Sequence, residues 1–153
     1  LDPDESLPLD KLRIGVKYLK EILDNLNLKP FLKTSGGKGY HVVVPFKNNL
    51  TWNKFYKISE DIANILANTY PEFFTTNIRK ENRKKKIFID YLRNQKSATF
   101  VAPYSVRLRK NAPVSMPIAW NELDKIKPNE ITIDKAIKRL KKKDPWENFF
   151  TSN

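Results

Sequence analysis

A glycine-rich turn that runs directly into a block of valines is the feature of this sequence that most restricts its fold. Residues 33–46 read KTSGGKGYHVVVPF. The three β-branched valines favour an extended strand, and the proline after them ends it. A P-loop needs a glycine five residues before the Gly-Lys pair and a Ser or Thr after it, but Leu32 and Gly39 occupy those positions. The turn is therefore predicted to lead into a strand and not into a helix.

Two long stretches carry apolar residues at the spacing of an amphipathic helix. The stripes are Leu12, Val16, Leu19, Leu23 and Leu26, then Phe55, Ile58, Ile62, Ile65 and Leu66. They predict one helix over residues 10–28 and a second helix that ends at Pro71. Asp10 and Thr51 are the expected N-caps, and Pro30 stops the first helix. We interpret both stripes as core packing.

The second half of the chain predicts short strands and one more helix. IFIDYL at residues 87–92 is apolar and β-prone except for Asp90, a carboxylate that requires an explanation inside a strand. Residues 133–140 form a short amphipathic helix with a lysine-rich face. Helices that alternate with short strands predict an α/β or α+β fold, with a mixed sheet flanked by helices.

Residues 97–109, SATFVAPYSVRLR, predict one strand to about Ala102 and then a second extended stretch. In that stretch, alternation places Ser105, Arg107 and Arg109 on one face. Two guanidinium groups on one face are suited to binding phosphate oxygens.

Composition limits the kind of protein and its partners. The chain has 153 residues, which is the length of one domain, and its net charge of +12 indicates a polyanionic partner, most simply nucleic acid. Lysine-rich composition also fits a role in solubility alone. The absence of cysteine excludes disulfides and thiolate metal sites. No membrane span or signal peptide is evident, so we expect a soluble protein.

Three aspartates are candidate metal ligands. Asp2 and Asp4, separated by Pro3, would point to one side of an extended chain, and Asp90 could join them from a neighbouring strand. Three carboxylates suit two divalent cations that act on a nucleoside triphosphate. A terminal LDPD segment is also typical of a simple turn.

The glycine turn carries several groups that favour phosphate. Its backbone N–H groups can approach an anion closely, and Ser35 and Lys38 add a donor and a charge. His41, the only histidine, could donate to a phosphate or simply be a satisfied histidine at the root of a strand. The run RKENRKKK at residues 79–86 is as consistent with a solvated face as with a binding site.

Taken together, four segments resemble the polymerase domain of bacterial and archaeal DNA ligase D, a member of the archaeo-eukaryotic primase superfamily. They are LDPD, TSGGKGYHVVVP, RKKKIFIDYLRN and ATFVAPYSVRLRKNAPVSMPIAW. The resemblance covers nearly the whole chain, including KDPWENFF near its end.

The resemblance implies a role for each candidate residue. Asp2, Asp4 and Asp90 match the catalytic metal ligands of the family, which hold two Mn²⁺ or Mg²⁺ ions. The residues matched to nucleotide and triphosphate contacts are Ser35, Lys38, His41, Arg107 and Arg109. Arg83 and Arg93 fall where the family places polar residues near the nucleotide and the templating strand.

The implied function is a template-dependent nucleotidyltransferase that fills gaps or extends DNA ends in non-homologous end joining. Its expected partners are DNA ends or gapped DNA, ribo- or deoxyribonucleoside triphosphates, and Ku with a DNA ligase module, in a prokaryotic cytoplasm. Residues 1–153 would be the catalytic half of such a domain, and we expect an upstream half to carry the primer-end contacts. Two alternatives are a catalytically incompetent nucleic-acid-binding fragment and a stand-alone DNA primase.

Overall fold

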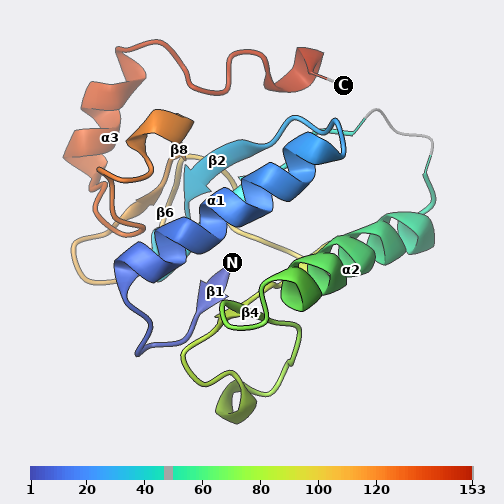
Figure 1. Ribbon diagram of the computed structural model, residues 1–153. Helices are drawn as coiled ribbons and strands as arrows, with labels where there is room; N and C mark the ends of the chain where they lie inside the picture. Colours follow the sequence, from blue (N-terminus) through green and yellow to red (C-terminus); the bar gives the residue numbers. More distant parts are fainter. Residues whose placement is uncertain (47–49, 153) are drawn as a thin grey trace. The chain divides into compact units, whose positions relative to one another are not determined.

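The structure, a computed structural model, describes residues 1–46 and 50–152. The chain forms two compact units, here called unit 1 (Leu1–Ile22 and Lys47–Phe100) and unit 2 (Leu23–Phe46 and Val101–Asn153). Figure 1 shows the mixture of helices and short strands that the sequence predicts. In the two described ranges, no helix is both long enough and apolar enough to span a membrane.

Unit 1 combines two long helices with a three-stranded sheet. Its elements are β1 (Asp2–Pro3), most of α1 (Leu9–Asn25), α2 (Trp52–Thr69), β4 (Phe74–Thr75), the 3-10 turn η1 (Lys80–Asn82), β5 (Ile87–Phe88) and the 3-10 turn η2 (Tyr91–Arg93). The strand order is β1-β5-β4, with β1 antiparallel and β4 parallel to β5. The predicted mixed sheet is therefore present in this unit.

Helix α1 packs closely on this sheet through a small residue. A Cβ atom added to Gly15 would lie 2.4 Å from Ile87 Cδ1 and 3.1 Å from the Phe74 ring, so the Ile87 side chain would have to shift to admit one. One turn further along, the Tyr18 ring stacks on Tyr70 with centroids 3.9 Å apart. The packing of α1 thus fixes the positions of β4 and β5.

The helix caps are partly as predicted. Thr51 is the N-cap of α2 and accepts a hydrogen bond from the Lys54 N–H at 3.4 Å. The prediction for Asp10 is wrong, because α1 begins at Leu9 and Asp10 lies in its first turn, paired with Arg13 at 3.3 Å. Helix α1 also ends three residues earlier than expected, before Asn27 adopts a positive φ of 57°.

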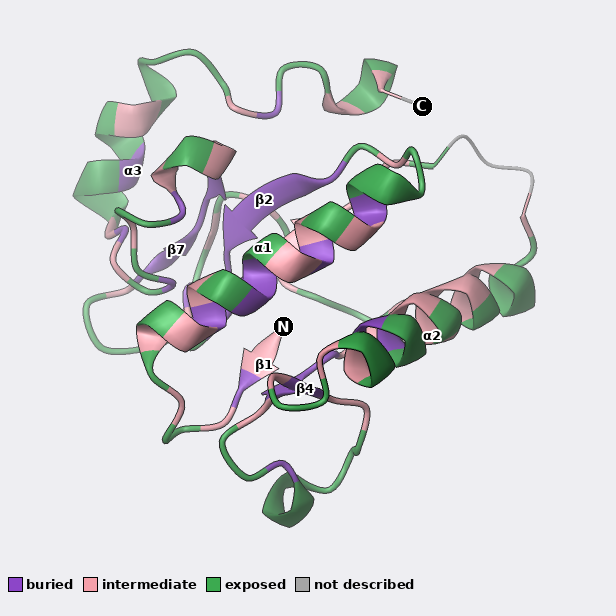
Figure 2. Cartoon of the chain, in the orientation of Figure 1, coloured by how far each residue is buried: buried purple, intermediate pink, exposed green. Residues whose placement is uncertain are grey.

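Unit 2 contains the strands that surround the glycine turn. Its elements are β2 (Phe31–Thr34), β3 (Tyr40–Val43), β6 (Ser105–Val106), β7 (Val114–Ser115), β8 (Pro117–Ile118), η3 (Trp120–Glu122), α3 (Ile133–Leu140) and η4 (Phe149–Thr151). Strands β3-β2-β8 form one antiparallel sheet, and β6 pairs with β7 in a second. Both β2 and β7 are buried along their length (Figure 2).

The end of the chain covers β2 from outside. The Trp146 indole N–H donates to the Leu32 carbonyl at 2.9 Å, and the Trp146 ring packs edge-on against Phe31. Helix α3 has the predicted bounds, but only its Ala136 is buried, and most of its apolar stripe is exposed. The core of unit 2 is therefore completed by the tryptophan segment after α3.

Two strand predictions are wrong. Residues 97–102 form no strand, and β6 is limited to Ser105–Val106. Strand β5 ends at Phe88, so Asp90 lies after the strand, at the start of η2. The carboxylate that seemed misplaced inside a strand is thus in a turn, where its side chain can remain hydrated.

Leu66 and its neighbour Ile65 on α2 provide a test of the core of unit 1. Leu66 is fully buried, whereas Ile65 is 48% exposed. Leu66→Ala is expected to lower the free energy of unfolding by about 2–5 kcal/mol, because it leaves a cavity. Ile65→Ala, the matched control, is expected to cost less than about 1 kcal/mol. Urea denaturation of both variants measures the difference, and equal losses would show that Leu66 is not a core residue.

Candidate functional site

The glycine loop, residues 35–39, closes the hairpin between β2 and β3. The strands pair in a continuous register that ends with Lys33 opposite His41 and Thr34 opposite Tyr40. The Ser35 N–H then donates to the Gly39 carbonyl at 3.2 Å, which closes the loop. The loop therefore leads into a strand, as the sequence predicts, and differs from a P-loop.

Two backbone N–H groups of this loop are used within the protein. The Gly36 N–H donates to the Pro128 carbonyl at 2.9 Å, and the Gly37 N–H donates to Ser35 Oγ at 3.0 Å. The expectation that the amides of Gly36 and Gly37 face an anion therefore does not hold in this conformation. Because Ser35 Oγ accepts from Gly37, its own hydroxyl proton can be donated to a ligand. The exposed side chain of Lys38 extends from the same loop.

The structure brings Arg107 and Arg109 to the glycine loop. A Cβ atom at Gly36, whose φ is +65°, would lie 2.5 Å from Arg107 Cγ. A Cβ atom at Gly37 would lie 3.7 Å from Arg109 Cζ. Both arginines follow β6, and the Arg107 N–H donates to the Pro113 carbonyl at 2.8 Å. The side chains of Arg107 and Arg109 thus lie beside the loop that carries Ser35 and Lys38, and these residues are a set of donors that suits a polyphosphate.

His41 lies in β3, opposite Lys33 of β2, and is half-buried. Burial lowers its pKa to about 3, and nearby positive charges, including those of Lys33 and Arg107, act in the same direction. The imidazole is therefore neutral near pH 7. It can offer a phosphate an N–H donor but no charge.

The candidate metal ligands lie in unit 1. Asp2 is in β1 opposite Phe88 of β5, and Asp4 follows β1 with its N–H bonded to the Lys86 carbonyl at 3.0 Å. Asp90 comes two residues after Phe88. Residues two apart in an extended chain share a face of a sheet, so the register favours placing Asp2 and Asp4 on one side, whereas Asp90 lies beyond the end of β5. The donor atoms are carboxylate oxygens, which suit Mn²⁺ or Mg²⁺.

Each of these carboxylates has a partner within the protein. Asp2 Oδ2 accepts from Arg83 Nη1 at 2.9 Å, Asp4 Oδ1 accepts from the Ser6 N–H at 3.0 Å, and Asp90 Oδ2 pairs with Arg93 Nε at 3.3 Å. Over residues 1–46 and 50–152, no three acidic or histidine side chains form a group that could hold a metal. The convergence of the three aspartates on metal thus stays a prediction.

Arg83 and Arg93 differ sharply in their surroundings. Arg83 is 8% exposed, and its guanidinium lies over the Phe88 ring at 3.8 Å and donates to the carbonyls of Asn77 and Ile78. Arg93 is exposed on η2. The predicted contacts of these two arginines with nucleotide and template also stay predictions.

Sequence reasoning passed over one residue beneath the loop. Lys33 is 0% exposed, and its Nζ donates to the Val101 carbonyl at 2.8 Å and to Ser115 Oγ at 2.6 Å. The local pattern gave no signal for it, because a lysine before a polar turn is usually solvated.

Comparisons with known proteins give a consistent result. A profile of the family described as LigD, primase-polymerase domain, matches residues 1–146. The chain is 39% identical over 153 residues to the multifunctional non-homologous end joining protein LigD of Pseudomonas aeruginosa, covering 97% of this chain and 18% of that protein. It is 33% identical over 135 residues to the bifunctional LigD of Bacillus subtilis, covering 86% of this chain and 22% of that protein.

A solved structure matches as well. It is the polymerase domain of Mycobacterium tuberculosis ligase D in complex with DNA, with a TM-score of 0.89 and 27% sequence identity. The match covers 98% of this chain and 53% of that chain. The present chain therefore spans about half of that solved domain and a smaller share of the full-length relatives.

Gly36 and Gly37 provide a matched pair for testing the loop geometry. Gly36→Ala is expected to cost about 1–2 kcal/mol for the positive φ alone, and to displace Arg107 as well. Gly37→Ala meets only ordinary contacts, the nearest being Ser35 Oγ at 3.4 Å, and is expected to change stability by less than about 0.5 kcal/mol. Urea denaturation and titration with inorganic tripolyphosphate measure both effects. Equal behaviour of the two variants would contradict the close packing of Arg107 on Gly36.

The buried Lys33 predicts a specific dependence of stability on pH. Burial, aided by the charge of Arg107, lowers its pKa from 10.5 to about 7. Between these values the unfolded chain binds the Lys33 proton and the folded chain does not, so the free energy of unfolding should rise with pH across this range. Denaturation of wild type and Lys33→Met at several pH values isolates the effect. A difference between the two proteins that is independent of pH would contradict the depressed pKa.

Proposed function

Because the chain belongs to the LigD primase-polymerase domain family, we propose that it is a template-dependent nucleotidyltransferase acting on DNA ends and gaps in non-homologous end joining. In this reaction the 3′-hydroxyl of a primer attacks the α-phosphate of a nucleoside triphosphate and pyrophosphate leaves. The observation that carries the proposal is the placement of Arg107 and Arg109 against the glycine loop. It supplies a site for the triphosphate that the reaction requires.

The residues of unit 2 would bind and orient the nucleotide. Arg107 and Arg109 offer charged forks to the phosphate oxygens, and Lys38 adds a further positive charge from the loop. Ser35 and the neutral His41 would donate hydrogen bonds that fix the orientation of the triphosphate. Fixing the α-phosphate in line with an attacking hydroxyl lowers the barrier mainly through positioning.

The carboxylates of Asp2, Asp4 and Asp90 would hold two divalent ions. When bound, Mn²⁺ or Mg²⁺ supplies positive charge to the attacking and leaving oxygens. Asp2 could bind a metal through its other carboxylate oxygen while Oδ2 stays hydrogen-bonded to Arg83. Asp90 could bind a metal only if its exposed ion pair with Arg93 breaks. Exposed ion pairs contribute about 0–1 kcal/mol, so breaking the Asp90–Arg93 pair costs little.

The proposed partner is DNA with a gap or an overhanging end. The net charge of +12 favours a polyanion, and the exposed lysines of residues 79–86 would contact phosphates. The solved M. tuberculosis polymerase domain is itself a DNA complex. Recruitment through Ku or a ligase module would follow from the role in end joining.

The decisive experiment for the function is a nucleotide-addition assay. The protein is mixed with gapped or overhanging DNA and Mn²⁺, with ribo- and deoxyribonucleotides in parallel reactions. We expect primer extension directed by the template. An upstream-extended version of the protein, assayed beside it, tests whether further sequence carries the primer-end contacts. Tight DNA binding without extension by either protein would contradict the proposal and identify a nucleic-acid-binding fragment instead.

Asp90→Ala tests the metal-binding carboxylates. We expect nucleotide addition to be abolished, because a ligand of the divalent ions is lost. DNA binding should be unchanged or slightly tighter, because a negative charge that repels phosphate is gone. Gel-based extension and DNA titration measure the two quantities.

Asp134→Ala, which removes an exposed carboxylate from the first turn of α3, is the matched control and should retain full addition. Normal turnover by the Asp90 variant would remove Asp90 from the catalytic group.

Arg107→Ala and Arg109→Ala test the triphosphate site. Each variant should weaken nucleotide binding by about 1.5–3 kcal/mol, the usual worth of a hydrogen bond to a charged group, with DNA affinity preserved. Lys84→Ala, in the basic run, should show the opposite pattern, with weaker DNA binding and a shallower dependence on salt. If the arginine variants lost affinity for DNA alone, these side chains would be contacts to the DNA backbone.

A further inference from the structure

Lys33 is a buried basic residue that has no direct part in the proposed reaction. It lies in the middle of β2, where all four residues are buried, and is itself 0% exposed. Placing an ammonium group in a protein interior is costly, and such groups are usually retained where they have a specific partner. Its position therefore needs an explanation other than solubility.

The contacts of Lys33 connect β2, which leads into the glycine loop, with the chain on either side of Arg107 and Arg109. Its Nζ donates to the Val101 carbonyl, which precedes β6, and to Ser115 Oγ on β7. Ser115 Oγ in turn donates to the carbonyl of Thr34, the last residue of β2 before the glycine loop. The Lys33 ammonium and the Ser115 hydroxyl thus link β2 to both sides of the segment that carries Arg107.

The packing around Arg107 leaves its side chain little room to move. Strands β6 and β7 pair with Ser105 opposite Ser115, and the Arg107 N–H continues this ladder to the Pro113 carbonyl. The Arg107 side chain then lies so close to Gly36 that a single added carbon would come within 2.5 Å of Cγ. A small shift of β7 relative to β2 would therefore move Arg107 off the loop.

We propose that Lys33 is a positioning residue of the nucleotide site, which holds the β6–β7 hairpin against β2 so that Arg107 and Arg109 face the glycine loop. The inference rests on the proposed function, and it assigns Lys33 an effect on nucleotide affinity and not on the chemical step. Lys33 itself does not touch the nucleotide, because it is fully buried behind the loop.

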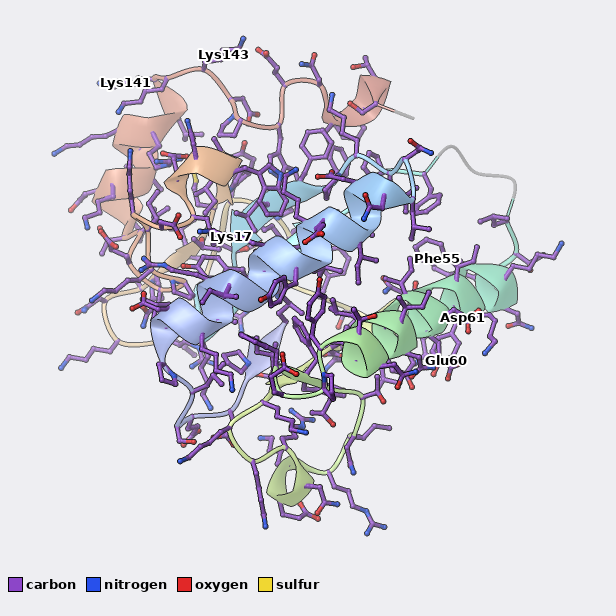
Figure 3. The ribbon with its side chains drawn as sticks, viewed as in Figure 1. Lys17, Phe55, Glu60, Asp61, Lys141 and Lys143 are labelled. Atoms are coloured by element: carbon purple, nitrogen blue, oxygen red, sulfur yellow. The ribbon has the colours of Figure 1, made fainter. Side chains whose placement is uncertain are left out.

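The test compares three variants of the full chain. Lys33→Met keeps the length of the side chain and removes its donors, and Ser115→Ala removes one of its acceptors. Lys141→Met is the matched control, because Lys141 is exposed and extends away from the end of α3 (Figure 3). The measurements are the dissociation constant for ATP with Mn²⁺, the dissociation constant for gapped DNA, and kcat at saturating nucleotide.

Lys33→Met is expected to weaken ATP binding about tenfold or more, and Ser115→Ala by about three- to tenfold. DNA affinity and kcat at saturating ATP should stay within about twofold of wild type, as should every value for Lys141→Met. A purely structural role would instead lower DNA affinity, kcat and ATP affinity together.

The outcomes separate the inference from the function on which it rests. If wild type binds ATP and both folded variants match it within about twofold, the positioning role is wrong while the proposed function stands. If Lys33→Met does not fold, Ser115→Ala decides alone by the same criterion. If wild type fails to bind ATP, the proposed function and this inference are both overturned.

Discussion

The close packing of Gly36 against Arg107 is the contact on which the candidate nucleotide site depends. It requires a positive φ at Gly36 and leaves no room for a Cβ atom. The hydrogen bond from the Gly36 N–H to the Pro128 carbonyl holds the loop from one side, and the β6–β7 hairpin holds the arginines from the other. Strand β2, which leads into the loop, is buried along its whole length.

The aspartates depend on a different kind of support. Asp2 is placed by the pairing of β1 with β5, and the buried Arg83 holds one of its oxygens while lying on the ring of Phe88. A carboxylate held by an arginine has a defined direction. The same arginine competes with any cation for that carboxylate. Binding of divalent ions would therefore be coupled to the local arrangement of Arg83.

Sequence reasoning succeeded where local chemistry dominates. The strand after the glycine loop followed from β-branched residues and a closing proline, and α3 (Ile133–Leu140) followed from the spacing of its apolar residues. It failed where tertiary contacts decide. Residues 97–102 have strand-like composition but no partner strand in the described structure, and the burial of Lys33 depends on Val101 and Ser115, which are distant in sequence. The resemblance implied that Arg107 and the glycine turn both bind the triphosphate, but the contact of Arg107 with Gly36 was not predicted, because no local pattern encodes it.

We propose that this chain binds a nucleoside triphosphate at the glycine loop and divalent ions at its aspartates. The most direct measurement is a crystal structure with Mn²⁺ and a non-hydrolysable nucleoside triphosphate, using the anomalous signal of manganese. We expect triphosphate density against Arg107, Arg109 and Lys38, and manganese peaks at the carboxylates of Asp2, Asp4 and Asp90. Manganese bound elsewhere, or a triphosphate that contacts only the basic run of residues 79–86, would contradict it.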